Sequence, residues 1–147
     1  EEFRLPELRA EEVPYSGRTD VAISKDLLRA HDLPATDDHI HRLIAGYLER
    51  LPAALTKFGG RVCPGVPELL AAVAGRPDVR LGLLTGNVRR GAEHKLSHYG
   101  LWRYFAFGGF GDAHEDRDDV ARAAVADAER HAGGRVDPAT VWVIGDT

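Results

Sequence analysis

The stretch Val-Arg-Leu-Gly-Leu-Leu-Thr-Gly-Asn, residues 79–87, decides the fold class of this chain. Its apolar part, residues 79–84, is short and mostly aliphatic, which is typical of a strand buried inside a parallel sheet. The run stops at Thr85, Gly86 and Asn87, and small polar residues in this position indicate a turn that leads from a strand into a helix. The stretch therefore predicts a buried strand that ends in a polar turn.

The same pattern recurs twice toward the C-terminus. Residues 105–110 are a second strand candidate, which two glycines at 108 and 109 weaken because glycine has no side chain to pack. Residues 141–144 are a third short apolar run, followed by Gly-Asp-Thr. Helical spacing of apolar residues predicts helices over residues 66–73, 88–99 and 120–128. Strands that alternate with helices predict an α/β fold with a parallel, doubly wound sheet.

The first part of the chain has a different character, because nothing in it resembles a strand. Residues 20–31 place apolar side chains at helical spacing. A second helix, capped by Thr36 or Asp37, follows with a regular apolar stripe as far as Leu51. This part therefore reads as a pair of helices that need a packing partner.

A pair of glycines at positions 59 and 60 interrupts the helical pattern and indicates a linker. We therefore expect two parts. Residues 1–59 form a small α-helical domain, and residues 60–147 form the α/β core.

Composition excludes several classes of protein. A chain of 147 residues with 44% hydrophobic and 29% charged residues has the size and composition of one globular domain. The net charge of −4 argues against a nucleic-acid or anionic-membrane binder, and no apolar run approaches the roughly 18 residues of a membrane span. The single cysteine, Cys63, excludes an internal disulfide and is expected to be a packed small hydrophobe. We therefore expect a soluble cytoplasmic protein, and its excess of arginine over lysine is associated with a bacterial source.

Polar residues follow two of the predicted strands at their carboxyl ends, where parallel sheets bind ligands. The Thr85 hydroxyl and the N–H groups that open the next helix can hold phosphate oxygens, and Gly86 lets the backbone approach a ligand closely. Asp146, after the third run, can hold a hard cation such as Mg²⁺. The alternative is that both sequences are ordinary strand-to-helix turns with capping residues.

The order of these motifs resembles the haloacid-dehalogenase (HAD) superfamily. The resemblance is carried by residues 83–87, 96–105 and 143–147, and it extends over essentially the whole chain. Residues 64–70 and 16–20 are similar to the phosphoglycolate-phosphatase-like branch, which carries a helical cap. This likeness implies a three-layer Rossmann-like parallel core with a small α-helical cap domain.

The resemblance also implies a chemistry. Its members hydrolyse phosphomonoesters through an aspartyl-phosphate, with Mg²⁺ held by acidic residues, here Asp146. Thr85 would hold the phosphoryl group, with Gly86 and Asn87 in the substrate-binding turn. Arg117 is the candidate cation that balances the phosphoryl charge. The implied substrate is a small phosphorylated metabolite.

Two further cations enter this interpretation. Lys95 is the rival of Arg117, although its place in the middle of a helix favours a solvated face. The alternative for Arg117 itself is a charged loop with helix-capping aspartates. Arg18 lies in a glycine-containing turn of the predicted cap and is the candidate for gripping a substrate carboxylate or phosphate.

The chain departs from the family pattern in one respect. The motif Asp-x-Asp-Gly-Thr, which carries the nucleophile, does not occur in these residues, and the second acidic position of the metal motif is also missing. We therefore expect the native polypeptide to carry a strand with this motif before Glu1 and a further segment after Thr147. The alternatives are a phosphomutase or dehalogenase on the same fold, or a non-catalytic degenerate module. A dehalogenase needs no Mg²⁺, so Asp146 argues against it.

Two other patterns suggest metal sites but fit poorly. His94 and His98 lie four residues apart on one predicted helix face, but no third ligand is implied nearby, which favours surface histidines. The acidic stretch 115–119 lacks the glycine and terminal glutamate of an EF-hand loop. Neither pattern is interpreted as a metal site.

Overall fold

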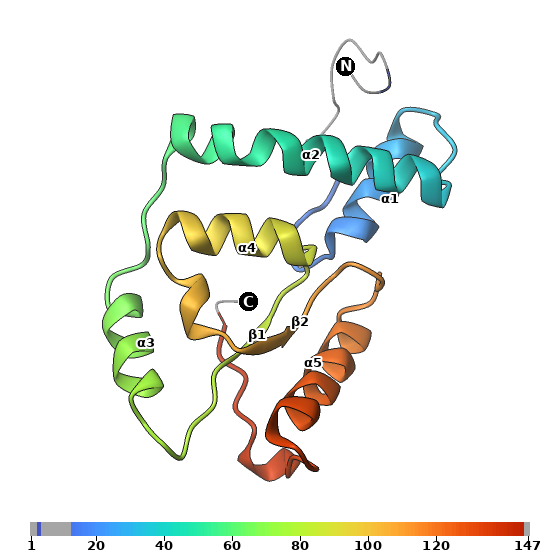
Figure 1. The fold of residues 1–147 in the computed structure, drawn as a ribbon. Helices are drawn as coiled ribbons and strands as arrows, with labels where there is room; N and C mark the ends of the chain where they lie inside the picture. The colour runs from blue at the N-terminus through green and yellow to red at the C-terminus, as the bar shows by residue number, and fades with distance from the viewer. Residues whose placement is uncertain (1–2, 4–12, 146–147) are drawn as a thin grey trace.

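The computed structural model describes Phe3 and residues 13–145, and its helices and strands alternate as in an α/β protein (Figure 1). The elements are, in chain order, α1 (Asp20–Ala30), α2 (Asp37–Phe58), α3 (Val66–Ala74), β1 (Gly82–Leu84), α4 (Arg89–His98), the 3₁₀ helix η2 (Trp102–Tyr104), β2 (Phe107–Gly109), α5 (Arg117–Ala132) and the 3₁₀ helix η3 (Pro138–Thr140). The five α-helices lie where the apolar spacing predicts them, and these predictions are confirmed.

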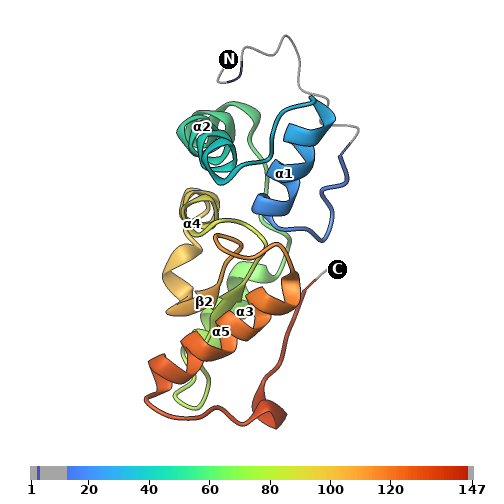
Figure 2. The same cartoon turned by 90° about the vertical axis from the view of Figure 1, so that its right-hand side faces the viewer.

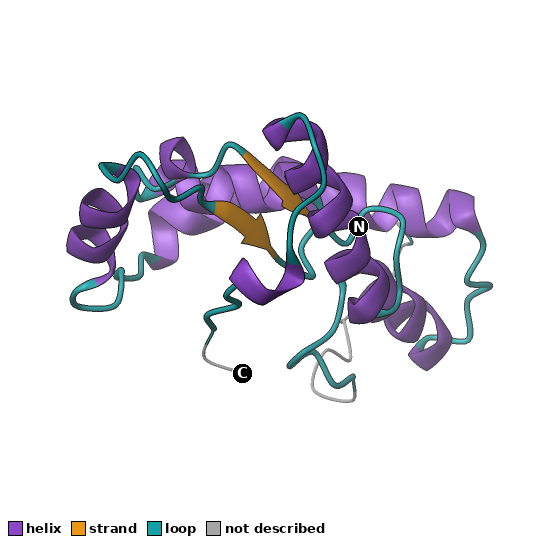
Figure 3. Ribbon diagram, turned by 90° about the horizontal axis from the view of Figure 1, so that it is seen from below, coloured by secondary structure: helices purple, strands orange, loops and turns teal. Residues whose placement is uncertain are grey.

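The two strands pair in parallel and form a small sheet (Figure 3). Leu83 lies opposite Gly108, and α5 packs against β2. A methyl group at Gly109 would overlap the Val120 carbonyl oxygen and lie 2.8 Å from the Ala124 Cβ atom. The glycines that weaken this segment as a strand therefore allow the close approach of helix and strand.

The helical pair begins at side-chain caps. Thr19 accepts a hydrogen bond from the Ala22 N–H at 3.2 Å, and Thr36 accepts one from the His39 N–H at 3.3 Å. Helix α2 extends beyond the apolar stripe that ends at Leu51, and it continues through Pro52 to Phe58, directly before the glycine pair. Even so, no described helix is long and apolar enough to cross a membrane.

Helix α4 lies between α2 and the strands (Figures 1 and 2). A methyl group at Gly91 would lie 3.4 Å from the Tyr47 Cε1 atom, so the small residue on α4 makes room for the aromatic ring from α2. The buried apolar side chains come from both parts of the chain: Val13, Ala22, Leu28, Ile40, Leu51, Val88, Ala92, Leu101 and Val120. The helical pair thus packs directly on the α/β part.

The connection from α2 to α3 is irregular, as the two glycines predict. Gly59 and Gly60 both have positive φ values, 65° and 154°, in the range that favours glycine. Cys63 is exposed in this connection, so its expected role as a packed small hydrophobe is wrong. The physical reason is that a connecting segment without secondary structure runs over the surface.

The expected third strand is absent from the described part of the chain. Residues 141–145 form no strand, and their apolar side chains face solvent, with Trp142 85% and Ile144 84% exposed. A strand exists only where another strand satisfies its N–H and C=O groups, and nothing in residues 13–145 pairs with this segment. Two of the three expected strands are therefore present.

A side chain from α5 completes the hydrogen bonding of β2 and gives the fold a pH dependence. Asp127 accepts a hydrogen bond from the Gly108 N–H at 2.9 Å, and this bond, with help from Arg130, holds the pKa of the Asp127 carboxyl below its ordinary value. Stability from the carboxylate is therefore present above about pH 4 and is lost as the pH falls through the lowered pKa.

We expect Asp127→Asn to lower the free energy of unfolding at pH 7 by at most about 1 kcal/mol, because the amide keeps a neutral acceptor in a partly solvated place. The difference from the parent should shrink as the pH falls below about 4. Chemical denaturation at a series of pH values measures this. A difference that does not change with pH would contradict the role of the charge.

Candidate functional site

The polar turn after β1 is tied to the chain that follows β2. The Thr85 N–H donates to the Gly109 carbonyl at 3.1 Å, and the Gly111 N–H donates to the Asn87 carbonyl at 2.9 Å. The Asn87 N–H donates to the Thr85 hydroxyl oxygen at 3.2 Å. The carboxyl ends of both strands therefore meet at one place, as expected for parallel neighbours.

The start of the helical pair lies against this turn. The Asp20 N–H donates to the Gly86 carbonyl at 2.8 Å, and a methyl group at Gly86 would overlap the Arg18 carbonyl oxygen. Thr19 is fully buried, and its hydroxyl donates to the Glu115 carbonyl at 3.3 Å. The Gly86 backbone therefore lies close to the backbone of residues 18–20, and its close approach to a ligand stays a prediction.

Asn87 connects two charged side chains that lie far apart in the sequence. Its amide donates to an Asp20 carboxylate oxygen at 3.2 Å, and its amide oxygen accepts from the Lys95 ammonium at 3.1 Å. The same ammonium lies 5.7 Å from the centre of the Tyr47 ring. The structure thus brings Asp20 and Lys95 to the turn.

Lys95 was expected on a solvated helix face, and this expectation is wrong. The side chain is half-buried and reaches back two turns along α4 to Asn87. The physical reason is that helical side chains slant toward the N-terminus of their helix. Lys95 therefore lies at the strand-end turn.

Carboxylates occupy the N-terminal amides of α4. The Val88 N–H donates to Asp20 at 2.8 Å, and the Arg89 N–H donates to Asp112 at 2.8 Å. Both arrangements suit the positive end of a helix dipole, which attracts negative charge. The N–H groups expected to hold phosphate oxygens are therefore hydrogen-bonded to the protein's own carboxylates in this structure.

The two arginines of the predicted site, Arg18 and Arg117, lie at the turn around Gly17. Arg18 pairs with Asp26 and keeps a third of its side chain exposed. Arg117 is the first residue of α5, and a methyl group at Gly17 would lie 3.9 Å from its Nη1 atom. No carboxylate of residues 13–145 forms an ion pair with Arg117. The helix-capping alternative also holds nearby, because Asp116 accepts from the Asp118 N–H at 2.8 Å.

Sequence reasoning did not identify Lys25, a further cation near the segment that leads into α5. Lys25 of α1 forms an ion pair with Glu115, in the segment that leads into α5. The two residues are 90 positions apart, so no local pattern in the sequence signals the contact. This pair and the Thr19 hydrogen bond hold the helical part to the segment before Arg117.

Asp146, the predicted metal ligand, lies outside the described residues. Within the described part of the chain, no three histidine, cysteine, aspartate or glutamate side chains come together. His94 is half-buried and His98 is exposed with its ring against Tyr99, centroids 4.8 Å apart. The described residues alone therefore do not form a metal site.

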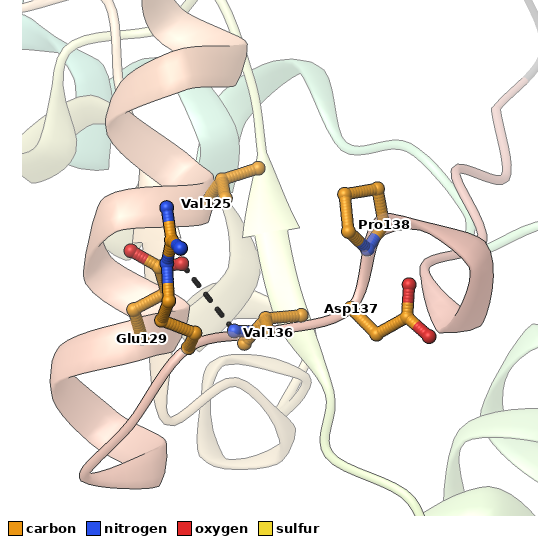
Figure 4. Close-up of a pocket in the computed structure, with 6 residues that line it drawn as sticks. Val125, Glu129, Val136, Asp137 and Pro138 are labelled. Carbon is orange, nitrogen blue, oxygen red and sulfur yellow. Dashed lines mark hydrogen bonds between the residues drawn. The ribbon is translucent and has the colours of Figure 1, made fainter.

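A hollow in the described part of the chain lies away from the predicted site residues. It has a volume of about 480 Å³ and is lined by Val125 and Glu129 of α5 and by residues 135–138 (Figure 4). The Val136 N–H donates to Glu129 at 3.3 Å along its wall. None of the predicted site residues lines it, so it does not form part of the strand-end site.

Comparison with models of known protein families identifies the family of this chain. The model of the haloacid dehalogenase-like hydrolase family matches residues 4–147, and the chain belongs to this family. Membership indicates an enzyme with hydrolase activity, in a family that usually uses a divalent metal. A comparison with curated proteins finds no match.

Proposed function

We propose that the protein is a Mg²⁺-dependent hydrolase of phosphomonoesters of small metabolites, similar to phosphoglycolate phosphatases, that acts in the cytoplasm through an aspartyl-phosphate. One observation supports this proposal above all. The turn at Thr85, Gly86 and Asn87 meets the end of β2 and the Arg18–Asp20 backbone at one place, and the Lys95 ammonium donates to the Asn87 amide of this turn. A hydroxyl in a turn that also carries an ammonium suits a dianionic phosphoryl group.

In this proposal each residue of the turn has a defined task. The Thr85 hydroxyl donates to a phosphoryl oxygen, because it accepts from the Asn87 N–H and keeps its own proton free for this use. Gly86 and Asn87 hold the backbone and amide of the binding turn in place. Arg117 balances the phosphoryl charge, with Lys95 as the second candidate. Positive charge at the site lowers the free energy of a bound dianion.

Arg18 is proposed to grip the rest of the substrate. Its guanidinium now pairs with Asp26, so a substrate carboxylate or phosphate would replace one anionic partner by another. The proposed architecture gives Arg18 this position: residues 1–59 are a cap, residues 60–147 belong to a three-layer Rossmann-like core, and Gly59 and Gly60 form the hinge. Closure of such a cap excludes water from the reaction.

Metal and nucleophile are proposed from family membership. Mg²⁺ would shield the phosphoryl charge, and Asp146 would hold it. The described residues do not supply the other ligands, and the nucleophile motif is absent from the 147 residues. The steps that this chain's described residues support are therefore binding, orientation and charge balance.

A non-catalytic binding module is the second candidate, and one observation favours it. Asp20 and Asp112 already occupy the first amides of α4, where a phosphate would otherwise bind. A phosphomutase or a dehalogenase on the same fold is distinguished from the phosphatase by its product. Mutases transfer the phosphoryl group within or between substrates, and dehalogenases release halide.

The proposal is tested on the full-length protein with a panel of phosphomonoesters. We expect release of inorganic phosphate with Mg²⁺ present. Turnover should fall at least about 100-fold after chelation, because the metal lowers the free energy of the charge that develops in the transition state by several kcal/mol. Halide release from a haloacid would instead support the dehalogenase. Full turnover in the chelator would contradict Mg²⁺ dependence, and no turnover on any ester would support the binding module.

A further inference from the structure

A line of three half-buried side chains joins the helical part to the strand-end turn. Asp20 Oδ1 accepts from Asn87 Nδ2 at 3.2 Å, and Asn87 Oδ1 accepts from Lys95 Nζ at 3.1 Å. The other carboxylate oxygen of Asp20 accepts from the Val88 N–H at 2.8 Å. Asp20 therefore contacts both the amide of Asn87 and the start of α4.

The chemistry of these groups permits one arrangement only. A carboxylate accepts hydrogen bonds, an ammonium donates them, and a side-chain amide has one face of each kind. Asn87 satisfies both neighbours only with its NH₂ toward Asp20 and its oxygen toward Lys95. Since the Asp20 carboxylate cannot donate, it fixes which face of the amide Lys95 meets.

We propose that Asp20 is a positioning residue of the strand-end site, which acts through Asn87 to hold the Lys95 ammonium beside the turn, where it attracts a phosphoryl group. The inference rests on the proposed phosphatase function for the class of ligand. The contact with the Tyr47 ring holds the ammonium from its other side. Asp20 thus links the helical part to the charge of the site.

Two substitutions separate this role from the capping of α4. Asp20→Asn keeps an oxygen for the Val88 N–H, but its NH₂ faces the NH₂ of Asn87. The Asn87 amide must then turn over, which presents NH₂ to Lys95 and displaces the ammonium. Asp20→Ala removes the acceptor from Val88 and leaves Asn87 free to keep its oxygen toward Lys95. Both variants remove the same negative charge, so the difference between them reports on the amide.

The measurement is the affinity of the full-length protein for inorganic phosphate by calorimetry, together with the thermal unfolding midpoint. We expect Asp20→Asn to bind phosphate about tenfold or more weakly, since a charge-assisted hydrogen bond contributes about 1.5–3 kcal/mol and 1.4 kcal/mol is tenfold. Its midpoint should stay close to that of the parent. We expect Asp20→Ala to lower the midpoint by several degrees and to keep phosphate affinity within about threefold. Asp38→Asn, at an exposed position of α2, is the matched control and should change neither quantity.

The opposite ranking would overturn the proposal. A purely structural role predicts that Asp20→Ala loses at least as much phosphate affinity as Asp20→Asn, because asparagine is the closer replacement. A parent protein that does not bind phosphate would also overturn it. A parent that binds phosphate with the expected ranking but hydrolyses no phosphomonoester would support the positioning role and contradict the proposed phosphatase function alone.

Discussion

Replacing Thr85 by valine is expected to lower kcat for a phosphomonoester about 100-fold or more in the full-length protein, because one preorganised donor to a developing charge is lost. Thr85 follows β1 directly, and its hydroxyl oxygen already accepts from the Asn87 N–H at 3.2 Å. The hydroxyl proton is therefore available for the phosphoryl group. Valine keeps the branched shape of threonine and removes only the hydroxyl, so the loss in turnover measures that group.

Two comparisons make the result specific. Thr85→Ser retains the hydroxyl and should recover most of the lost turnover. Thr56→Val removes a hydroxyl that donates to the Pro52 carbonyl within α2, and it should leave kcat unchanged. The Asn87 N–H loses its partner in Thr85→Val, which costs about 1 kcal/mol of stability, so folding is checked by circular dichroism. Near-normal kcat in the folded valine variant would remove Thr85 from the site.

The helices could be predicted from the sequence because their signals are local. The apolar stripe of α2 and its cap at Thr36 lie within a few residues of each other, and both appear in the structure as expected. Gly133 ends α5 in the left-handed conformation for the same reason. Helix α2 continues past Leu51, the last residue of its apolar stripe, and ends directly before Gly59, where the glycine pair interrupts the helical pattern.

The strands were harder to predict, since a strand depends on residues elsewhere in the chain. The glycines at 108 and 109 look unfavourable alone, yet they are required by the contact of Gly109 with Val120 and Ala124. Residues 141–144 have a strand-like composition, but they find no partner among the described residues. Composition alone does not supply that partner.

The site was predictable to the extent that it follows a strand end. Thr85, Gly86 and Asn87 were identified because a polar turn after an apolar run is a recognisable pattern. Asp20 was not, because it resembles an ordinary helix start and contacts a residue 67 positions away, and Lys95 was named only as the rival of Arg117. Only the three-dimensional arrangement shows that a carboxylate of the helical part accepts a hydrogen bond from the Asn87 amide.

A substitution at Gly86 is expected to have a large effect on stability, because two segments of backbone approach closely there. A methyl group there would overlap the Arg18 carbonyl oxygen and lie 3.1 Å from the Thr19 Cα atom. On its other side, the Gly86 carbonyl accepts from the Asp20 N–H at 2.8 Å. Since the opposing atoms are backbone, no side chain can rotate away to relieve the overlap. The Arg18–Asp20 segment or the turn itself must move.

We therefore expect Gly86→Ala to lower the free energy of unfolding by about 3 kcal/mol, the upper end of the usual cost of overpacking. For a domain of this size that corresponds to a fall of about 10 °C in the unfolding midpoint. Gly134→Ala is the matched control, because nothing lies within 4 Å of the added methyl group and the φ value is not in the left-handed range. It should change stability by less than about 1 kcal/mol, because the methyl group meets no atom and the restriction of the unfolded chain by alanine is a small effect. Thermal unfolding of both variants in the full-length protein decides the question: equal midpoints would show that residues 18–20 do not pack against the strand-end turn, and the joint between the helical part and the core would have to lie elsewhere.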